Sequence, residues 1–144
     1  MLASIFIAGG IDAAKDPEGK AGAAEKVASP LARTLGLPED TTMLVRVNGV
    51  VQVVAGGLLA LGRLPRLSAT VLVASLVPTT LAGHRFWEED DDAARAGQRV
   101  HFLKNAAVVG GLILAATDTE GRPSLRWRAR KAAAKGRKAL PIGD

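Results

Sequence analysis

Residues 67–83 form an unbroken run of seventeen residues without a charged side chain, LSATVLVASLVPTTLAG. A helix that crosses a bilayer needs about 20 predominantly apolar residues, with a lower limit near 17. A surface helix in water keeps a polar face along one side, and this run has none. The run therefore predicts a membrane-spanning helix.

Three further apolar runs accompany it: Leu2–Ile11, Met43–Leu61 and Phe102–Ala116. The second has the length of a span, and the other two are short by themselves. We expect an all-α chain that forms a transmembrane four-helix bundle with up-down-up-down topology. A soluble four-helix bundle is the competing fold. A cleaved signal peptide over residues 1–14 is disfavoured because its n-region lacks Lys and Arg. The spans are expected at about 1–14, 41–62, 65–84 and 100–118.

Proline, glycine and acidic residues mark the expected helix boundaries. Ser29-Pro30 predicts the start of a short helix that Gly36 ends. Pro38 and the two acids after it begin the second span, where the helix dipole favours negative charge. The polar and acidic segment 88–98 predicts a loop between the third and fourth spans.

The net charge of +5 is concentrated in the last part of the chain. Residues 119–144 contain eight Lys or Arg and two acids, whereas residues 1–118 contain eleven and twelve. Four spans place this tail, the N-terminus and the 62–66 turn on one side of the membrane. That side carries more Lys and Arg than the other, which favours the cytoplasm. We expect a multi-pass protein of the inner (plasma) membrane with both termini cytoplasmic.

The tail itself, 119–144, is expected to be a basic segment, either amphipathic or disordered, outside the membrane domain. Trp127 lies between two arginines, and good helix formers follow it. A basic amphipathic helix binds anionic lipid at the cytoplasmic leaflet. We expect no nucleic acid as a partner, because the segment follows a span directly and lacks a recognisable reading module.

Polar residues gather at one end of the expected bundle. The ends of the first and third spans and the starts of the second and fourth meet at the non-cytoplasmic face. Ionisable groups inside a membrane cost about 2.5–3.5 kcal/mol each at a helix centre, so they are hypotheses for a functional site. The candidate binding or structural cluster consists of Asp12, Arg46, Asn48, Gln52, Thr79, Thr80, His84, Arg85, Trp87, His101, Lys104 and Asn105.

Simpler interpretations exist for several of these residues. Arg46 is one turn inside its helix, so it can extend its charge to the interface or form a structural ion pair with Asp12. Trp87 is expected to anchor the chain at the membrane interface. His84 and His101 lack a supporting set of ligands, so we expect hydrogen-bonded histidines and no metal site.

No catalytic motif can be assembled from the sequence. The glycine pairs lie inside apolar runs rather than at strand-to-helix turns, so they do not form a phosphate-binding loop. A Ser-His-Asp order is missing. Because the chain contains no cysteine, thiol chemistry and thiolate metal sites are excluded. We therefore expect a chain that is not an enzyme on its own.

Five motifs carry a resemblance to a known family: FIAGGID (6–12), VRVNGVVQ (45–52), LGRLPR (61–66), VPTTLAGHRFWE (77–88) and HFLKN (101–105). With these motifs, residues 1–128 resemble the DoxX family of small bacterial membrane proteins, in the form common among actinobacteria. The resemblance implies a four-span membrane domain over residues 1–118. The family is named by association with a thiosulfate:quinone oxidoreductase, and most members have no assigned activity.

Two functions follow as hypotheses. In the first, the chain is an accessory or quinone-interacting subunit of a membrane redox (oxidoreductase) complex, with a quinone head group near Arg46, Gln52, His84 and Lys104. Its partners are then the lipid bilayer and membrane redox proteins, and quinone is the candidate cofactor. In the second, the chain is a structural or interaction protein with no redox role, and its polar cluster serves helix packing. A transporter is disfavoured, because repeats and paired broken helices are missing.

Overall fold

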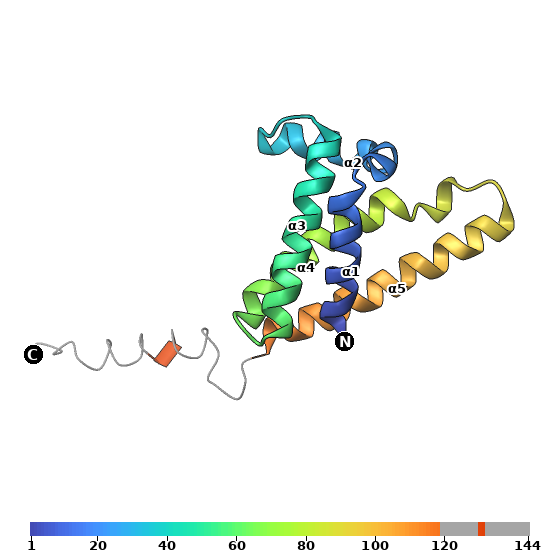
Figure 1. The fold of residues 1–144 in the computed structure, drawn as a ribbon. Helices are drawn as coiled ribbons and strands as arrows, with labels where there is room; N and C mark the ends of the chain where they lie inside the picture. The colour runs from blue at the N-terminus through green and yellow to red at the C-terminus, as the bar shows by residue number, and fades with distance from the viewer. Residues whose placement is uncertain (119–129, 132–144) are drawn as a thin grey trace, which may run out of the picture.

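The computed structural model describes residues 1–118 and 130–131, and Figure 1 shows the arrangement of the helices. The elements in chain order are α1 (Leu2–Lys15), α2 (Glu18–Leu35), α3 (Thr41–Ala60), α4 (Pro65–Gly83), the short 3₁₀ helix η1 (Phe86–Glu88) and α5 (Asp92–Thr117). Within residues 1–118 no strand is present, so the all-α prediction is confirmed for this part. The predicted basic tail lies outside the described residues, apart from Arg130 and Lys131.

Three of the helical segments are long and apolar enough to cross a membrane. They are Thr41–Ala60, Pro65–Glu88 and Asp92–Thr117. The first helix, α1, contains 14 residues, which corresponds to about 21 Å. This length is shorter than the hydrocarbon core of about 30 Å. The described residues thus contain three candidate spans, and α1, which covers the span expected at 1–14, is short for that role.

The core is built mainly from small and medium-sized side chains of four helices. Phe6 of α1, Leu72 of α4 and Leu112 of α5 are fully buried. Ala55, Ala69, Leu76 and Val108 complete this core. Because the side chains between the helices are small, the helices approach closely, as is common for helices packed in lipid.

Large apolar side chains also cover much of the outside. Val54 on α3 is 57% exposed and Leu114 on α5 is 72% exposed. Leu67 at the start of α4 is exposed as well. A chain in water keeps its contiguous apolar patches small. The apolar exterior of the long helices indicates that the protein is embedded in a lipid bilayer.

The helices form two close pairs. In Figure 1, α1 and α3 run alongside each other, whereas α4 and α5 cross them obliquely. The first pair is held by glycines: Gly10 contacts the backbone of Gly49, and Gly56 lies against Ile7 and the backbone of Ala3. The glycines of α5 are packed less closely, since Gly111 lies next to Leu2 and Gly110 has open space beside it.

The helix α2 differs from its prediction at the start. It begins at Glu18, and Pro30 lies inside it rather than at its first position. The carbonyl oxygen of Pro30 accepts a hydrogen bond from the Thr34 hydroxyl at 2.9 Å. The end agrees with the prediction: Gly36 adopts a left-handed conformation with φ of 65°, which glycine tolerates best. In Figure 1, α2 lies across the ends of α1 and α3.

The helix α5 starts earlier than predicted, so the loop expected over 88–98 is wrong for most of its length. The carboxylate of Asp91 accepts a hydrogen bond from the N–H of Ala94 at 2.7 Å and caps the helix. Asp92 adds a negative charge in the first turn, where the helix dipole stabilises it. As a result, the first part of α5 extends away from the other helices (Figure 1).

Candidate functional site

A ladder of amides and hydroxyls joins α3 to α4. The Gln52 side chain donates to the Ser75 hydroxyl at 2.9 Å, and this hydroxyl donates to the Asn48 carbonyl oxygen at 2.7 Å. The Asn48 amide in turn donates to the Thr79 hydroxyl at 3.2 Å. Gln52 and Ser75 are only 7% and 6% exposed. The inner half of the ladder is thus shielded from water, whereas Thr79 at its outer end is exposed, and the four side chains together hold the two helices in register.

A second polar contact joins α4 to α5. The Asn105 amide donates to the Thr80 hydroxyl at 3.1 Å. That hydroxyl donates to the carbonyl oxygen of Leu76 at 2.8 Å, one turn earlier in the same helix. Thr80 is buried. Polar residues of the ladder and of this contact therefore form their hydrogen bonds mainly with one another or with the backbone of their own helix. They are Asn48, Gln52, Thr79, Thr80 and Asn105.

The two histidines form a pair where α4 ends and α5 passes. The rings of His84 and His101 stack with centroids 5.1 Å apart and planes 15° apart. The Nδ1 atom of His84 lies 2.8 Å from the Gln98 side-chain oxygen. Because an amide oxygen only accepts, His84 donates in this contact.

Lys104 extends this pair on the exposed side. Its Nζ atom lies 3.3 Å from Nδ1 of His101. An ammonium group only donates, so Nδ1 of His101 accepts, and a neutral His101 carries its proton on Nε2. His101 and Lys104 are both exposed. The histidine pair and Lys104 therefore form a group of ionisable side chains with hydrogen-bonding capacity still open to a ligand.

Two residues of the predicted cluster do not join it. Asp12 forms an ion pair with Lys20 at 2.6 Å, so of the two alternatives for Arg46 the ion pair with Asp12 is not formed. The reason is local, because the turn after α1 brings Lys20 of α2 back over the end of α1. Arg46 is exposed, and its side chain has no hydrogen bond or ion pair within residues 1–118.

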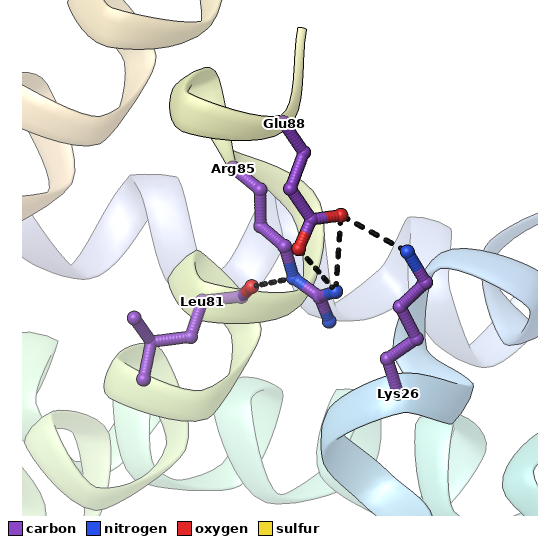
Figure 2. A network of polar contacts seen from close by, with 4 residues as sticks. All are labelled: Lys26, Leu81, Arg85 and Glu88. Atoms are coloured by element: carbon purple, nitrogen blue, oxygen red, sulfur yellow. Dashed lines mark hydrogen bonds and ion pairs between the residues drawn. The ribbon is translucent and has the colours of Figure 1, made fainter.

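Figure 2 shows the charged network around Arg85. The Nε atom of Arg85 donates to the Leu81 carbonyl oxygen at 2.7 Å, and Nη1 donates to the Glu88 carboxylate at 3.1 Å. Lys26 of α2 reaches the same carboxylate at 2.9 Å. Glu88 thus connects α2 to the segment after α4, and one carboxylate is shared by two cations.

Trp87 lies in an aromatic group beside this network. Its ring meets Phe86 edge to face at a centroid distance of 5.1 Å and Phe102 at 5.9 Å. Trp87 is 52% exposed. An aromatic side chain that is half buried at a helix end suits the boundary between lipid and water.

The described part of the chain contains no group of three or more His, Cys, Asp or Glu side chains placed to hold a metal ion. The amides, hydroxyls and imidazoles of this site form hydrogen bonds with one another. A neutral imidazole both donates and accepts a hydrogen bond.

The motifs in and before this site match a family model. The match is to DoxX and covers residues 1–85, which is more than half of the chain. The chain belongs to the DoxX family. A search of curated proteins and a search of solved structures each find no match to it.

The DoxX match divides the site. The match includes the ladder residues of α3 and α4, the segment Val77–Gly83 that contains Pro78, and His84. His101, Lys104 and Asn105 lie beyond its end, as does the rest of α5. The partner of His84 across the stacked pair is therefore supplied by a part of this DoxX chain that the family model does not cover.

Two residues of the DoxX site were missed in the sequence. Ser75 lies one turn before Thr79 on α4, and that spacing was a usable signal for a shared helix face. Gln98 falls in the segment predicted as a loop, whereas in the structure it belongs to α5 and lies one turn before His101 and Phe102.

Proposed function

We propose that this DoxX protein is an accessory subunit of a membrane redox complex, and that it contacts the head group of a quinone through His84, His101 and Lys104. The contact between His84 and His101, which stacks the two rings at 5.1 Å beside Lys104, carries the proposal. The chain on this view is a multi-pass protein of the inner (plasma) membrane with both termini in the cytoplasm. The electron-transferring groups belong to partner proteins.

The donors of this group suit a quinone. Quinone carbonyl oxygens accept hydrogen bonds, and Lys104 and the Nε2–H of a neutral His101 can donate them, whereas the Nδ1–H of His84 is already bonded to Gln98. Reduction of a quinone consumes protons, which a histidine near neutral pH can supply. The exposed position of His101 and Lys104 leaves room for a ligand, whereas the ladder of α3 and α4 has already satisfied its own donors.

A binding measurement tests the proposal. The purified protein in detergent is titrated with a short-chain menaquinone analogue, and binding is followed by quenching of tryptophan fluorescence. We expect His101→Leu and Lys104→Gln to weaken binding by roughly tenfold each, as for the loss of one hydrogen bond to a charged or polar group. Arg99→Gln is the matched control, because Arg99 is an exposed cation on the same helix. Unchanged binding in both variants, or no binding by the wild type, contradicts the proposal.

A structural role without redox function is the second candidate, and the ladder favours it. The buried contacts of Gln52, Ser75 and Asn48 need no ligand. On this alternative, His84→Ala and Lys104→Gln lower the melting temperature in detergent but leave the quinone-dependent activity of the membranes unchanged. Co-purification in mild detergent separates the two candidates, since only the first expects a redox enzyme to accompany the chain.

A further inference from the structure

A groove with a volume of about 760 Å³ lies between α2 and the second half of α4. Val27 and Leu31 line it from α2, and Val73, Val77 and Leu81 line it from α4. The volume falls within the range of roughly 300–1,000 Å³ that is typical of small-molecule sites. The walls are almost entirely apolar, so they suit a hydrocarbon chain.

One end of the groove is positively charged. Lys26 and Leu81 line the groove and also belong to the charged network of Figure 2. Lys26 and Arg85 share the single carboxylate of Glu88. The two cations and the one carboxylate together have a net charge of +1 at this end of the groove. An anionic group placed there gains from both cations.

Arg85 has a further donor that the protein leaves unused. Its Nη2 atom is buried and has no hydrogen-bond partner in the part of the chain that the structure describes. Buried donors are almost always paired. In Figure 2 the guanidinium of Arg85 points from the segment after α4 toward the α2 side, where Lys26 extends. An acceptor oxygen from a ligand at this position would complete the set.

We propose that the groove binds an anionic glycerophospholipid, with an acyl chain along the apolar walls and the phosphate at Lys26 and Arg85. Phosphate oxygens accept charge-assisted hydrogen bonds from lysine and arginine. The excess positive charge favours a headgroup with net negative charge over a zwitterionic one, whose own cation it repels. The groove is lined by none of His84, His101 and Lys104, so this site goes beyond the proposed contact with a quinone.

Native mass spectrometry of the full chain in detergent tests the headgroup. The protein is titrated with phosphatidylglycerol and, separately, with phosphatidylcholine of the same acyl chains. We expect tighter binding of phosphatidylglycerol, and a loss of roughly tenfold in Lys26→Gln, as for one hydrogen bond to a charged group. The Lys26 side chain is 69% exposed, so this variant keeps the fold. Lys15→Gln is the matched control, because Lys15 is exposed on α1 outside the groove.

A second pair of variants tests the acyl chain. Val77→Trp fills the groove and is expected to weaken phosphatidylglycerol binding, whereas Val54→Trp on the exposed side of α3 leaves it unchanged. Equal binding of the two lipids, or wild-type binding by Lys26→Gln or Val77→Trp, overturns the proposal. Retention of a menaquinone analogue in the groove without retention of phosphatidylglycerol overturns it too. Each of these outcomes leaves the test of quinone binding with His101→Leu unaffected.

Discussion

Gly10 of α1 and Gly49 of α3 meet backbone to backbone. A Cβ atom added to Gly10 would lie 2.6 Å from the Gly49 carbonyl oxygen, and one added to Gly49 would lie 2.7 Å from the Gly10 carbonyl oxygen. Real Cβ atoms essentially never show such distances. The short α1 is thus attached to α3 by van der Waals contact between main chains, which is how small residues associate helices in lipid.

This contact predicts that Gly49→Ala destabilises the protein. The methyl group meets backbone atoms that cannot rotate away, so overpacking should cost about 1–3 kcal/mol. Gly57→Ala on the same helix is the control, because nothing lies within 4 Å of the position. There, alanine should be neutral or stabilise by up to about 1 kcal/mol. Thermal unfolding in detergent measures both, and equal melting temperatures would contradict the close contact.

The ladder predicts a large effect of Ser75→Ala. The change removes the hydroxyl that accepts from the Gln52 amide and donates to the Asn48 oxygen, so the buried Gln52 amide and the partly buried Asn48 oxygen lose this partner. Each unsatisfied group costs about 1–3 kcal/mol, so the melting temperature should fall clearly. Thr70→Val is the control, since its exposed hydroxyl bonds only the Arg66 carbonyl oxygen of its own helix. A Ser75→Ala protein as stable as Thr70→Val would show that the ladder contributes nothing.

The cap of α5 predicts a local effect of Asp91→Ala. The carboxylate accepts from the Ala94 N–H, and removal of such a cap costs about 0.5–2 kcal/mol. Because this end of α5 extends away from the other helices, the first turn should fray without global unfolding. Hydrogen exchange of residues 92–96 should therefore speed up. Asp90→Ala, an exposed acid one position earlier, should leave exchange unchanged.

The link between α2 and α3 predicts a dependence on pH. Hydrogen bonds from Arg33 hold the pKa of Glu39 below its ordinary value of 4.5. A lowered pKa in the folded state gives stability that is present above the ordinary pKa and is lost as the pH falls through the lowered one. The difference in melting temperature between wild type and Glu39→Gln should thus shrink from pH 7 toward pH 3. Both side chains are exposed, so the effect should be small. A difference that stays constant across this range would argue against the ion pair.

The proposed orientation predicts the labelling of single cysteines in a chain that has none. Leu64→Cys in the turn between α3 and α4 should be protected from a membrane-impermeant maleimide in intact cells and react after lysis. Asp90→Cys, between η1 and α5, should react in intact cells. The reverse pattern would place the termini outside the cytoplasm.

The sequence predicted the long helices well because membrane burial depends on composition. An uncharged run such as 67–83 leaves few alternatives to a helix in lipid, and α4 covers it. The ends of the helices are harder to predict from the sequence. Pro30 has the features of a first helical residue, yet α2 passes through it, since packing of α2 on α3 and α4 outweighs the local preference.

Most hydrogen-bond and ion-pair partners of the side chains could not be predicted from the sequence. Asp12 bonds Lys20 rather than Arg46 because the geometry of one turn decides which cation is near. The contacts of Asn48 with Ser75 and of His84 with Gln98 depend on helix rotation and on the true start of α5. A pattern of spacing limits which residues share a face, but it does not fix which faces meet.

The length of α5 sets the depth of the histidine pair. Its 26 residues extend about 39 Å, whereas the hydrocarbon layer is about 30 Å thick. If the carboxyl end of α5 marks one boundary of that layer, the opposite boundary falls about 20 residues earlier, close to Gln98 and His101. The imidazoles would then sit where headgroups give way to acyl tails. At that depth, water reaches the imidazoles from the headgroup side and can deliver protons, while a lipid-soluble molecule reaches them from within the bilayer.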